Sequence, residues 1–173
     1  SSMAQFWWRY EAWRWMFWME LVPATIFLLA LLLIPESPRF LVLTRMLEER
    51  LEILFKQGHV VGGLYRSLGQ EATAVGSAYA LREGDWLAPS IRDAGALYVR
   101  GLPPIAMLRQ YTAREASPCA GKDNTTHFTI PELGLLGPIS PLGTQLCVLN
   151  GVALAFRQRG ESRVCMTYQG EGA

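Results

Sequence analysis

The sequence predicts an α/β fold for about residues 45–173, with one hydrophobic helix before it. Apolar residues recur at helical spacing in several segments, and the run from Arg163 to Tyr168 that follows them has the character of a β-strand. A glycine turn, Gly170-Glu171-Gly172-Ala173, comes directly after that run. Helix, strand and glycine turn in this order are typical of α/β domains, in which ligands bind beyond the strand ends.

The first helix of this region is predicted to begin near Met46 and to end before Gly58. Its apolar face is expected to comprise Met46, Leu47, Leu51, Leu54 and Phe55. Its polar face is expected to comprise Glu48, Glu49, Glu52 and Lys56.

Four further helices are predicted from the chain pattern. They cover about residues 70–81, 92–100, 105–114 and 146–156. Between the last two, residues 115–145 have no sustained period and many Gly, Pro, Ser and Thr residues. A loop of this length is usually functional or disordered.

The first 44 residues differ in composition from the rest of the chain. They contain all but one of the six tryptophans and a long apolar run. The apolar run over residues 15–34 is about long enough for one bilayer crossing, with the tryptophans placed as an interfacial belt. A signal peptide and a buried helix of a soluble protein are the alternatives. The predicted location is therefore the membrane if this segment is genuine, and otherwise the cytoplasm.

A resemblance accompanies this segment. Arg14-Trp15-Met16-Phe17, the apolar run, and Pro35-Glu36-Ser37-Pro38-Arg39-Phe40-Leu41 are similar to the sixth span and following loop of sugar-porter transporters. The resemblance implies a gating role for Glu36 and Arg39. Sugar transport by this chain is not expected, because a translocation path needs many helices and no second apolar run of sufficient length follows.

Net charge and cysteine spacing exclude several classes of function. The formal net charge is +1, which gives no electrostatic footprint for nucleic acid. Cys119, Cys147 and Cys165 lie far apart, and neither His59 nor His127 lies beside a cysteine or another histidine. A structural zinc site is therefore not expected.

A second resemblance covers about residues 45–173. The motifs that carry it are, in order, Gly69-Gln70-Glu71-Ala72, Arg92-Asp93, His127, Ile139-Ser140-Pro141-Leu142-Gly143-Thr144-Gln145 and Gly170-Glu171-Gly172-Ala173. In order and approximate spacing they resemble the alpha subunit of branched-chain 2-oxo acid dehydrogenases, whose pyruvate and acetoin relatives share a looser version. This resemblance implies a thiamine-diphosphate-binding fold, truncated here at its cofactor motif.

The family implies a role for each matching residue. Arg92 would bind the diphosphate of thiamine diphosphate, Glu171 would ligate Mg²⁺, and His127 would be an active-site histidine. Backbone contacts to the cofactor would come from Gly170, Gly172 and Ala173, and contacts to its aminopyrimidine from Ser140 and Leu142. Potassium, as a structural ion, would be bound by Pro141, Thr144 and Gln145.

Two positions depart from the family pattern: Ile91 replaces a tyrosine, and Ile139 replaces a serine of the potassium loop. The implied reaction is oxidative decarboxylation of a 2-oxo acid, with acyl transfer to a lipoyl disulfide on an acyltransferase partner. A beta subunit would supply the glutamate that activates the cofactor, and further family motifs lie beyond the glycine turn, so we expect this polypeptide alone not to catalyse the reaction. The alternatives are a transporter fragment and a fused or misjoined gene product without settled activity.

Overall fold

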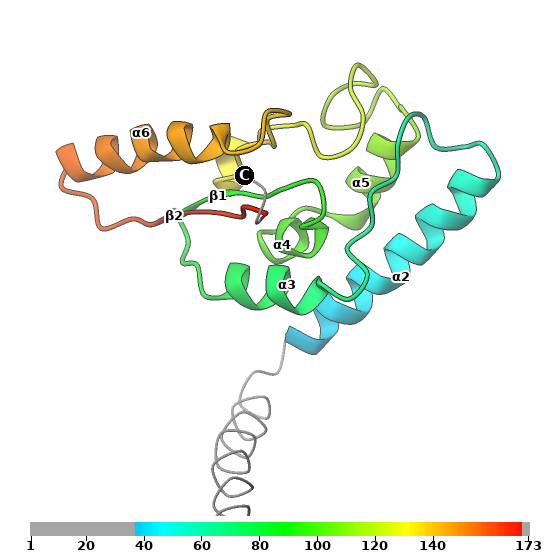
Figure 1. Cartoon of the computed structure of the whole chain (residues 1–173), viewed down its shortest axis with the longest axis horizontal. Coiled ribbons are helices and arrows are strands. Elements are labelled where there is room, and N and C mark those ends of the chain that lie inside the picture. Colours follow the sequence, from blue (N-terminus) through cyan, green and yellow to red (C-terminus); the bar gives the residue numbers. More distant parts are fainter. Residues whose placement is uncertain (1–36, 171–173) are drawn as a thin grey trace, which may run out of the picture. The chain divides into compact units, whose positions relative to one another are not determined.

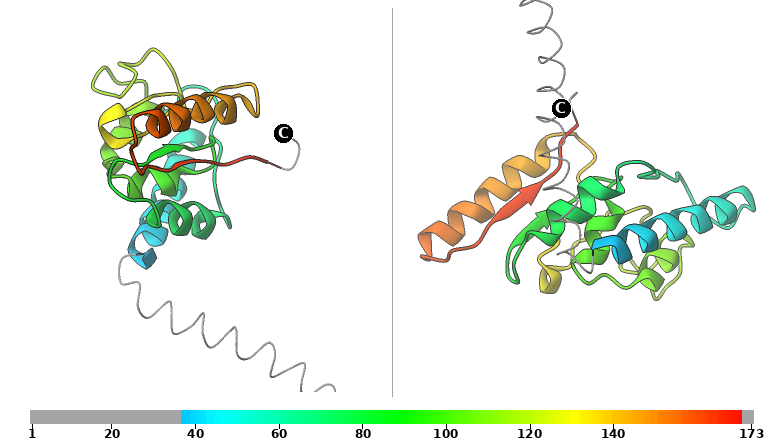
Figure 2. Two further views of the ribbon diagram at one scale, coloured as in Figure 1. Left: turned by 90° about the vertical axis from the view of Figure 1, so that its left-hand side faces the viewer. Right: turned by 90° about the horizontal axis from the view of Figure 1, so that it is seen from below.

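The computed structural model describes residues 37–170, in which helices surround a small parallel sheet (Figure 1). The elements in chain order are α2 (Ser37–Lys56), α3 (Glu71–Tyr79), β1 (Trp86–Ala88), α4 (Ala94–Val99), α5 (Pro104–Tyr111), the 3₁₀ helix η1 (Pro131–Leu133), α6 (Thr144–Gln158) and β2 (Cys165–Thr167). Strands β1 and β2 pair in parallel, with Leu87 opposite Met166. The two views in Figures 1 and 2 place α6 on one face of the strands and α3 with α4 on the other. A helix-rich chain with a parallel sheet agrees with the predicted α/β class.

Helix α2 begins earlier than predicted, at Ser37 instead of near Met46. Pro38 does not prevent this earlier start. Proline fits the first turn of a helix, because the amide N–H that it lacks has no partner there, and α2 uses Pro38 in this way. The predicted boundary between residues 44 and 45 therefore falls inside a continuous helix, while contacts group residues 37–173 as one unit separate from residues 1–36.

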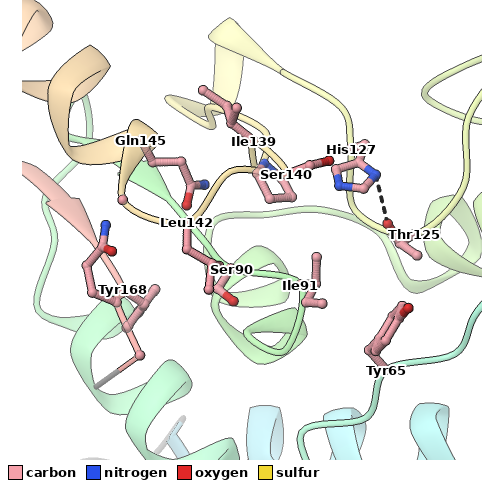
Figure 3. Close-up of a pocket in the computed structure, with 14 residues that line it drawn as sticks. Tyr65, Ser90, Ile91, Thr125, His127, Ile139, Ser140, Leu142, Gln145 and Tyr168 are labelled. Atoms are coloured by element: carbon pink, nitrogen blue, oxygen red, sulfur yellow. Dashed lines mark hydrogen bonds between the residues drawn. The ribbon is translucent and has the colours of Figure 1, made fainter. Parts of the chain in front are cut away.

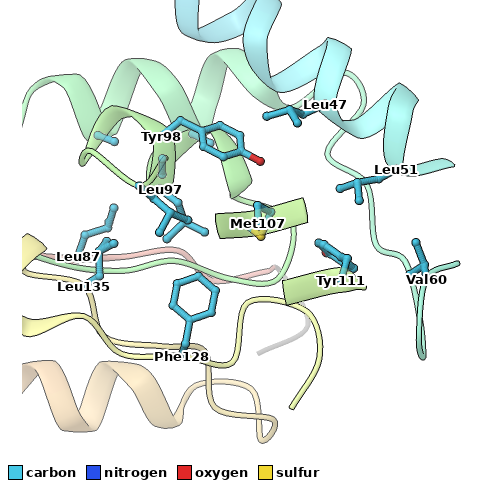
Figure 4. Packing of buried hydrophobic residues seen from close by; sticks show 14 residues of the cluster. Leu47, Leu51, Val60, Leu87, Leu97, Tyr98, Met107, Tyr111, Phe128 and Leu135 are labelled. Carbon is cyan, nitrogen blue, oxygen red and sulfur yellow. The ribbon is translucent and has the colours of Figure 1, made fainter. Parts of the chain in front are cut away.

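The hydrophobic core lies between α2, α3, α4 and α5 and extends to the long loop (Figure 4). Its most completely buried large side chains include Leu87 from β1, Leu97 from α4 and Met107 from α5. Phe128 and Leu135 bring the loop onto the same core. Burial of this kind is the main favourable term in folding, and it fixes the loop that carries His127.

One face of α2 was predicted wrongly. Glu48 is only 3% exposed, whereas Met46 and Phe55 are 63% and 44% exposed. Glu48 lies four residues after Thr44 and three before Leu51, and all three are buried, so they share the inward stripe of the helix. The pattern of hydrophobicity alone assigned the carboxylate to water, but Glu48 has hydrogen-bond partners inside the domain.

Strand β1 was not predicted, and it is the strand that pairs with the predicted one. It has only three residues, and its hydrogen-bonded partner lies far along the chain. Neither alternation nor length could reveal so short a strand. The predicted strand over residues 163–168 is confirmed at its centre, over Cys165–Thr167, and the predicted helices agree with α3, α4, α5 and α6 within a few residues.

Within residues 37–170, no helix is both long and apolar enough to cross a bilayer. The span predicted for residues 15–34 lies outside the described residues, as does most of the sugar-porter-like segment.

Candidate functional site

Two adjoining cavities lie where the carboxyl ends of β1 and β2 meet. The first has a volume of about 270 Å³ and is lined by Ser90 and Ile91, which follow β1, and by Tyr168 and Gly170, which follow β2. Parallel strands end at the same edge of a sheet, so residues from distant parts of the chain converge there. Loops at such an edge leave backbone groups free to contact a ligand.

Three other segments complete the first cavity (Figure 3). The loop before α6 and the first turn of that helix contribute Ser140, Leu142 and Gln145, the long loop contributes His127, and the segment between α2 and α3 contributes Tyr65. Leu142 is 75% exposed, so its apolar side chain is accessible to a ligand in this cavity. Gln145 is buried, and its Nε2 donates to the carbonyl oxygen of Pro89 at 2.8 Å, which ties α6 to the end of β1.

His127 is held by the loop in which it lies. Its Nδ1 is 3.1 Å from the hydroxyl of Thr125 and 3.7 Å from a carboxylate oxygen of Asp123. Thr125 has φ +56°, a left-handed conformation that β-branched residues rarely adopt. Strained backbone of this kind persists only where its surroundings hold it, and it clusters at ligand sites.

The second cavity has a volume of about 310 Å³ and contains Arg92. It shares Ser90, Tyr168, Gln169 and Gly170 with the first cavity. The ion pairs among residues 37–170 do not include Arg92, whose side chain is exposed. An exposed guanidinium beside a glycine backbone is suited to bind an anionic group.

Asp93, next to Arg92, has a structural role in the turn after β1. Its carboxylate accepts a hydrogen bond from the backbone N–H of Ser90 at 2.8 Å. Burial raises the pKa of Asp93, and this hydrogen bond opposes the rise. Asp93 therefore shapes the turn that carries Arg92 and does not neutralise it.

Tyr168 joins β2 to α3 at the wall between the cavities. Its hydroxyl lies 2.7 Å from the Ser77 hydroxyl and 3.2 Å from the carbonyl oxygen of Ala74. Burial raises the pKa of Tyr168, so the phenol stays protonated at neutral pH. The ring thus fixes the end of β2, from which Gly170 projects into both cavities.

The structure brings many of the predicted site residues together. His127, Ser140, Leu142, Gln145 and Gly170 line the first cavity, and Arg92 lines the second with Gly170. Pro141 and Thr144 are not among the described residues that line either cavity, although both adjoin residues that do. Glu171, Gly172 and Ala173 lie outside the described residues.

Several lining residues were missed by the sequence analysis. Tyr168 and Gln169 could have been found, since Tyr168 ends the predicted strand, Gln169 follows it, and strand ends carry sites. Gln70 lies in the first motif of the dehydrogenase resemblance, which gave it no role, and Tyr65 and Thr125 carry no local signal. Within the described part of the chain, no cluster of three or more His, Cys, Asp or Glu residues has the arrangement of a metal site.

Comparison with known proteins agrees with the motifs. The family model described as dehydrogenase E1 component matches residues 39–173. The chain is 33% identical over 126 residues to the alpha subunit of acetoin:2,6-dichlorophenolindophenol oxidoreductase of Cupriavidus necator, covering 73% of this chain and 38% of that protein. It is 32% identical over 135 residues to the pyruvate dehydrogenase E1 alpha subunit of Rhizobium meliloti, covering 78% and 39%. It is also 32% identical over 106 residues to the 2-oxoisovalerate dehydrogenase alpha subunit of Pseudomonas aeruginosa, covering 61% and 26%.

The chain thus spans about two fifths or less of the length of these relatives. The family match begins at Arg39, so Arg39-Phe40-Leu41 of the sugar-porter-like motif lies inside it and inside α2. The sugar-porter resemblance of residues 1–44 gains no support from these comparisons and stays a prediction. Over residues 39–173, which include both cavities, this chain belongs to the dehydrogenase E1 component family.

Proposed function

We propose that this chain is the front part of the alpha subunit of a 2-oxo acid dehydrogenase first component, and that its two cavities bind thiamine diphosphate. The main support for this proposal is the different lining of the two adjoining cavities. One is lined by exposed apolar side chains such as Leu142, the other contains Arg92, which forms no ion pair within residues 37–170, and they share Gly170. A molecule with a flat ring at one end and a diphosphate at the other matches this arrangement.

The donor set in the second cavity fits a diphosphate. The Arg92 guanidinium offers charge-assisted hydrogen bonds, and the backbone at Gly170 can approach a phosphate closely because a Cβ there would meet nothing within 4 Å. On the ring side, the loop before α6 would place Ser140 and Leu142 against the aminopyrimidine. Glu171 would complete the site as the Mg²⁺ ligand, and Pro141, Thr144 and Gln145 are the residues that would hold K⁺.

Thiamine diphosphate, when bound, supplies the carbanion chemistry that cleaves the bond between a carbonyl carbon and a carboxylate. The protein residues bind and orient the reactants. His127 faces the first cavity, and the Thr125 hydroxyl at Nδ1 fixes its ring and leaves Nε2 as the nitrogen that can exchange a proton with a bound molecule. Ile91 supplies no hydroxyl at this wall, so Arg92 carries more of the diphosphate binding than it would beside a tyrosine.

The proposed partners are a beta subunit, which would complete the active site, and a lipoyl-bearing acyltransferase, which would accept the acyl group. The proposed substrate is a branched-chain 2-oxo acid, because the Ser-Pro-Leu-Gly-Thr-Gln loop is closest to that class. Identity does not separate the classes, since the three acetoin, pyruvate and 2-oxoisovalerate relatives named above lie at 32–33%.

Calorimetric titration of the full chain with thiamine diphosphate and Mg²⁺ tests the proposal. Arg92→Ala is expected to weaken binding about ten- to a hundredfold, the range for loss of a charged hydrogen bond. Thiamine without its diphosphate should bind the variant and the wild type equally. Arg109→Ala is the control, because Arg109 is exposed on α5 and lines neither cavity. The proposal fails if the wild type does not bind the cofactor, or if Arg92→Ala behaves like the control.

The membrane contact predicted for residues 15–34 is a separate proposal that rests on the sequence. Alkaline carbonate extraction of the full chain tests it. Release of the chain into the soluble fraction would contradict a bilayer span.

A further inference from the structure

The segment that connects α2 to α3 forms a wall of both cavities. It contributes Tyr65 to the first cavity (Figure 3) and Gln70 to the second. Residues 61–66 of this segment have no helix or strand hydrogen bonding, so other contacts must determine its course. Near its start, the N–H of Val61 donates to the carbonyl oxygen of Tyr111 at 3.0 Å.

A buried carboxylate holds the middle of the segment. Both oxygens of Glu48 accept the backbone N–H of Ser67, at 3.0 Å and 2.8 Å, and the Ser67 hydroxyl donates to the same carboxylate. Glu48 is 3% exposed and Ser67 is 1% exposed, so water cannot replace these contacts. A buried donor that loses its acceptor carries its full desolvation penalty.

Two other carboxylates, Glu71 and Glu52, also contact this segment, and they differ in exposure. Glu71, 6% exposed, accepts the N–H of Gly69 at 2.8 Å and pairs with Arg45. Glu52 pairs with Arg66 near the surface, where solvent screens the interaction. Glu48 is therefore the most deeply buried of the carboxylates that hold this segment, and it acts between Tyr65 and Gln70.

A buried carboxylate is costly, and an apolar side chain of similar shape would often be at least as stabilising. Burial raises the pKa of two nearby tyrosines, Tyr98 and Tyr111, and the charge of Glu48 adds to the rise in each. The hydroxyl of Tyr98 has no hydrogen-bond partner among the described residues, so the interior here is not arranged to solvate a charge. The hydrogen bonds from Ser67 offset part of the cost of burying the Glu48 carboxylate, and an apolar side chain could not make them.

We propose that Glu48 is a positioning residue for the cofactor site, which fixes Ser67 and thereby sets Tyr65 in one cavity and Gln70 in the other. This inference rests on the proposed function, because it takes the two cavities as the site of thiamine diphosphate. Glu48 does not touch the ligand, and it acts through the backbone of the segment.

Glu48→Met, Glu48→Gln and Glu52→Gln of the full chain test this role. Met keeps the length of Glu and removes both acceptors, Gln keeps one acceptor, and Glu52→Gln is the control on the same helix. Two measurements are made on each variant: hydrogen–deuterium exchange over residues 61–70 without ligand, and calorimetric affinity for thiamine diphosphate with Mg²⁺. A general structural role would instead appear as faster exchange throughout the domain.

In Glu48→Met, exchange over residues 61–70 is expected to become about tenfold faster and the affinity about tenfold weaker, while α5 keeps its protection. Glu48→Gln should give smaller changes in the same direction, and Glu52→Gln should resemble the wild type. The inference is overturned if the Glu48 variants exchange like Glu52→Gln, or if affinity falls without local loosening. If Glu48→Met does not fold, Glu48→Gln is judged by the same two criteria.

The two proposals can fail separately. A wild-type chain that binds no thiamine diphosphate refutes the proposed function. A wild type that binds, together with Glu48 variants that bind equally well, refutes only the positioning role. Normal protection over residues 61–70 in Glu48→Met refutes the positioning role whatever the cofactor measurement gives.

Discussion

The two sides of the small sheet differ in how completely they are packed. On the side of α3 and α4, residues such as Val75 and Leu97 are at most 2% exposed. On the other side, α6 buries Leu149 and Phe156, but Leu154 is 54% exposed. Both cavities draw residues from the strand ends, and the loop that enters α6 lies at one of them. The α3–α4 side therefore contributes more of the buried packing, while both sides present residues to the cavities: Thr73 and Arg92 from one, Leu142 and Gln145 from the other.

Truncation of a core leucine should show this difference most strongly. Leu97→Ala is expected to lower the free energy of unfolding by about 3 kcal/mol, because it leaves a cavity in close-packed surroundings. The matched change on the other side, Leu154→Ala, should cost less than about 0.5 kcal/mol. Urea denaturation of both variants measures the two values. Equal costs would mean that the two sides contribute alike and that the comparison is wrong.

Asp85 links the two sides, and its loss should have the next largest effect. Its carboxylate accepts the N–H of Arg82 at 2.7 Å and that of Val164, ahead of β2, at 2.8 Å. Asp85 is 4% exposed, so Asp85→Ala leaves two donors without partners and should cost about 2 kcal/mol.

Asp85→Asn keeps one carbonyl acceptor and should cost less than Asp85→Ala. Hydrogen exchange at β2 distinguishes loss of this link from general destabilisation, since β2 should open before α4 does. Simultaneous opening of β2 and α4 would argue against a link role for Asp85.

The helices were largely predictable because they depend on local sequence. Leu47 and Leu51 repeat at the period of a helix, and their burial confirms this part of the predicted apolar face, although Met46 and Phe55 of the same prediction are exposed. The pattern failed where a non-local contact decides the outcome. Glu48 is buried because Ser67, from another segment, satisfies it, and β1 exists because a distant strand pairs with it. No window along the chain contains these partners.

The candidate site was predictable in part for a similar reason. Arg92, His127 and Gly170 belong to motifs whose order resembles a family, and the fold brings them to the two cavities. Tyr65 and Gln70 reach the same place through the path of the α2–α3 segment. That path depends on buried hydrogen bonds, which sequence spacing does not encode.

Two helical glycines should respond in opposite directions, with smaller effects. A Cβ at Gly95 in α4 would lie 2.8 Å from Cγ2 of Val75 and 3.1 Å from Oγ1 of Thr44, so Gly95→Ala should cost about 1–3 kcal/mol. A Cβ at Gly151 in α6 would meet nothing within 4 Å. Gly151→Ala should therefore stabilise the chain by about 0.5–1 kcal/mol through helix propensity. Thermal unfolding measures both signs, and destabilisation by Gly151→Ala would show that α6 has a packed outer face.

The smallest expected effect is a difference in the pH dependence of stability between two neighbouring carboxylates, Glu48 in α2 and Glu71 in α3. Burial raises the pKa of Glu48 above its usual range, opposed by hydrogen bonds from Ser67 and the charge of Arg66, while the charge of Glu71 adds to the rise. The hydrogen bond from Arg45 lowers the pKa of Glu71. The two neighbouring carboxylates therefore contribute pH dependences of opposite sign.

The folded state binds more protons at Glu48 than the unfolded state does at pH values above the ordinary carboxyl pKa of 4.5. Stability from this group therefore falls as the pH rises through its folded pKa. The stability of Glu48→Gln relative to that of the wild type should therefore rise as the pH rises above about 4.5. For Glu71 the folded pKa is depressed, so its contribution is present above the unfolded pKa and is lost as the pH falls through the folded pKa. Glu71→Gln should therefore lose stability relative to wild type as the pH rises from acid towards 4.5.

Urea denaturation at pH values below and above 4.5 measures both slopes. Slopes of the same sign would show that Glu48 is better solvated than its 3% exposure indicates.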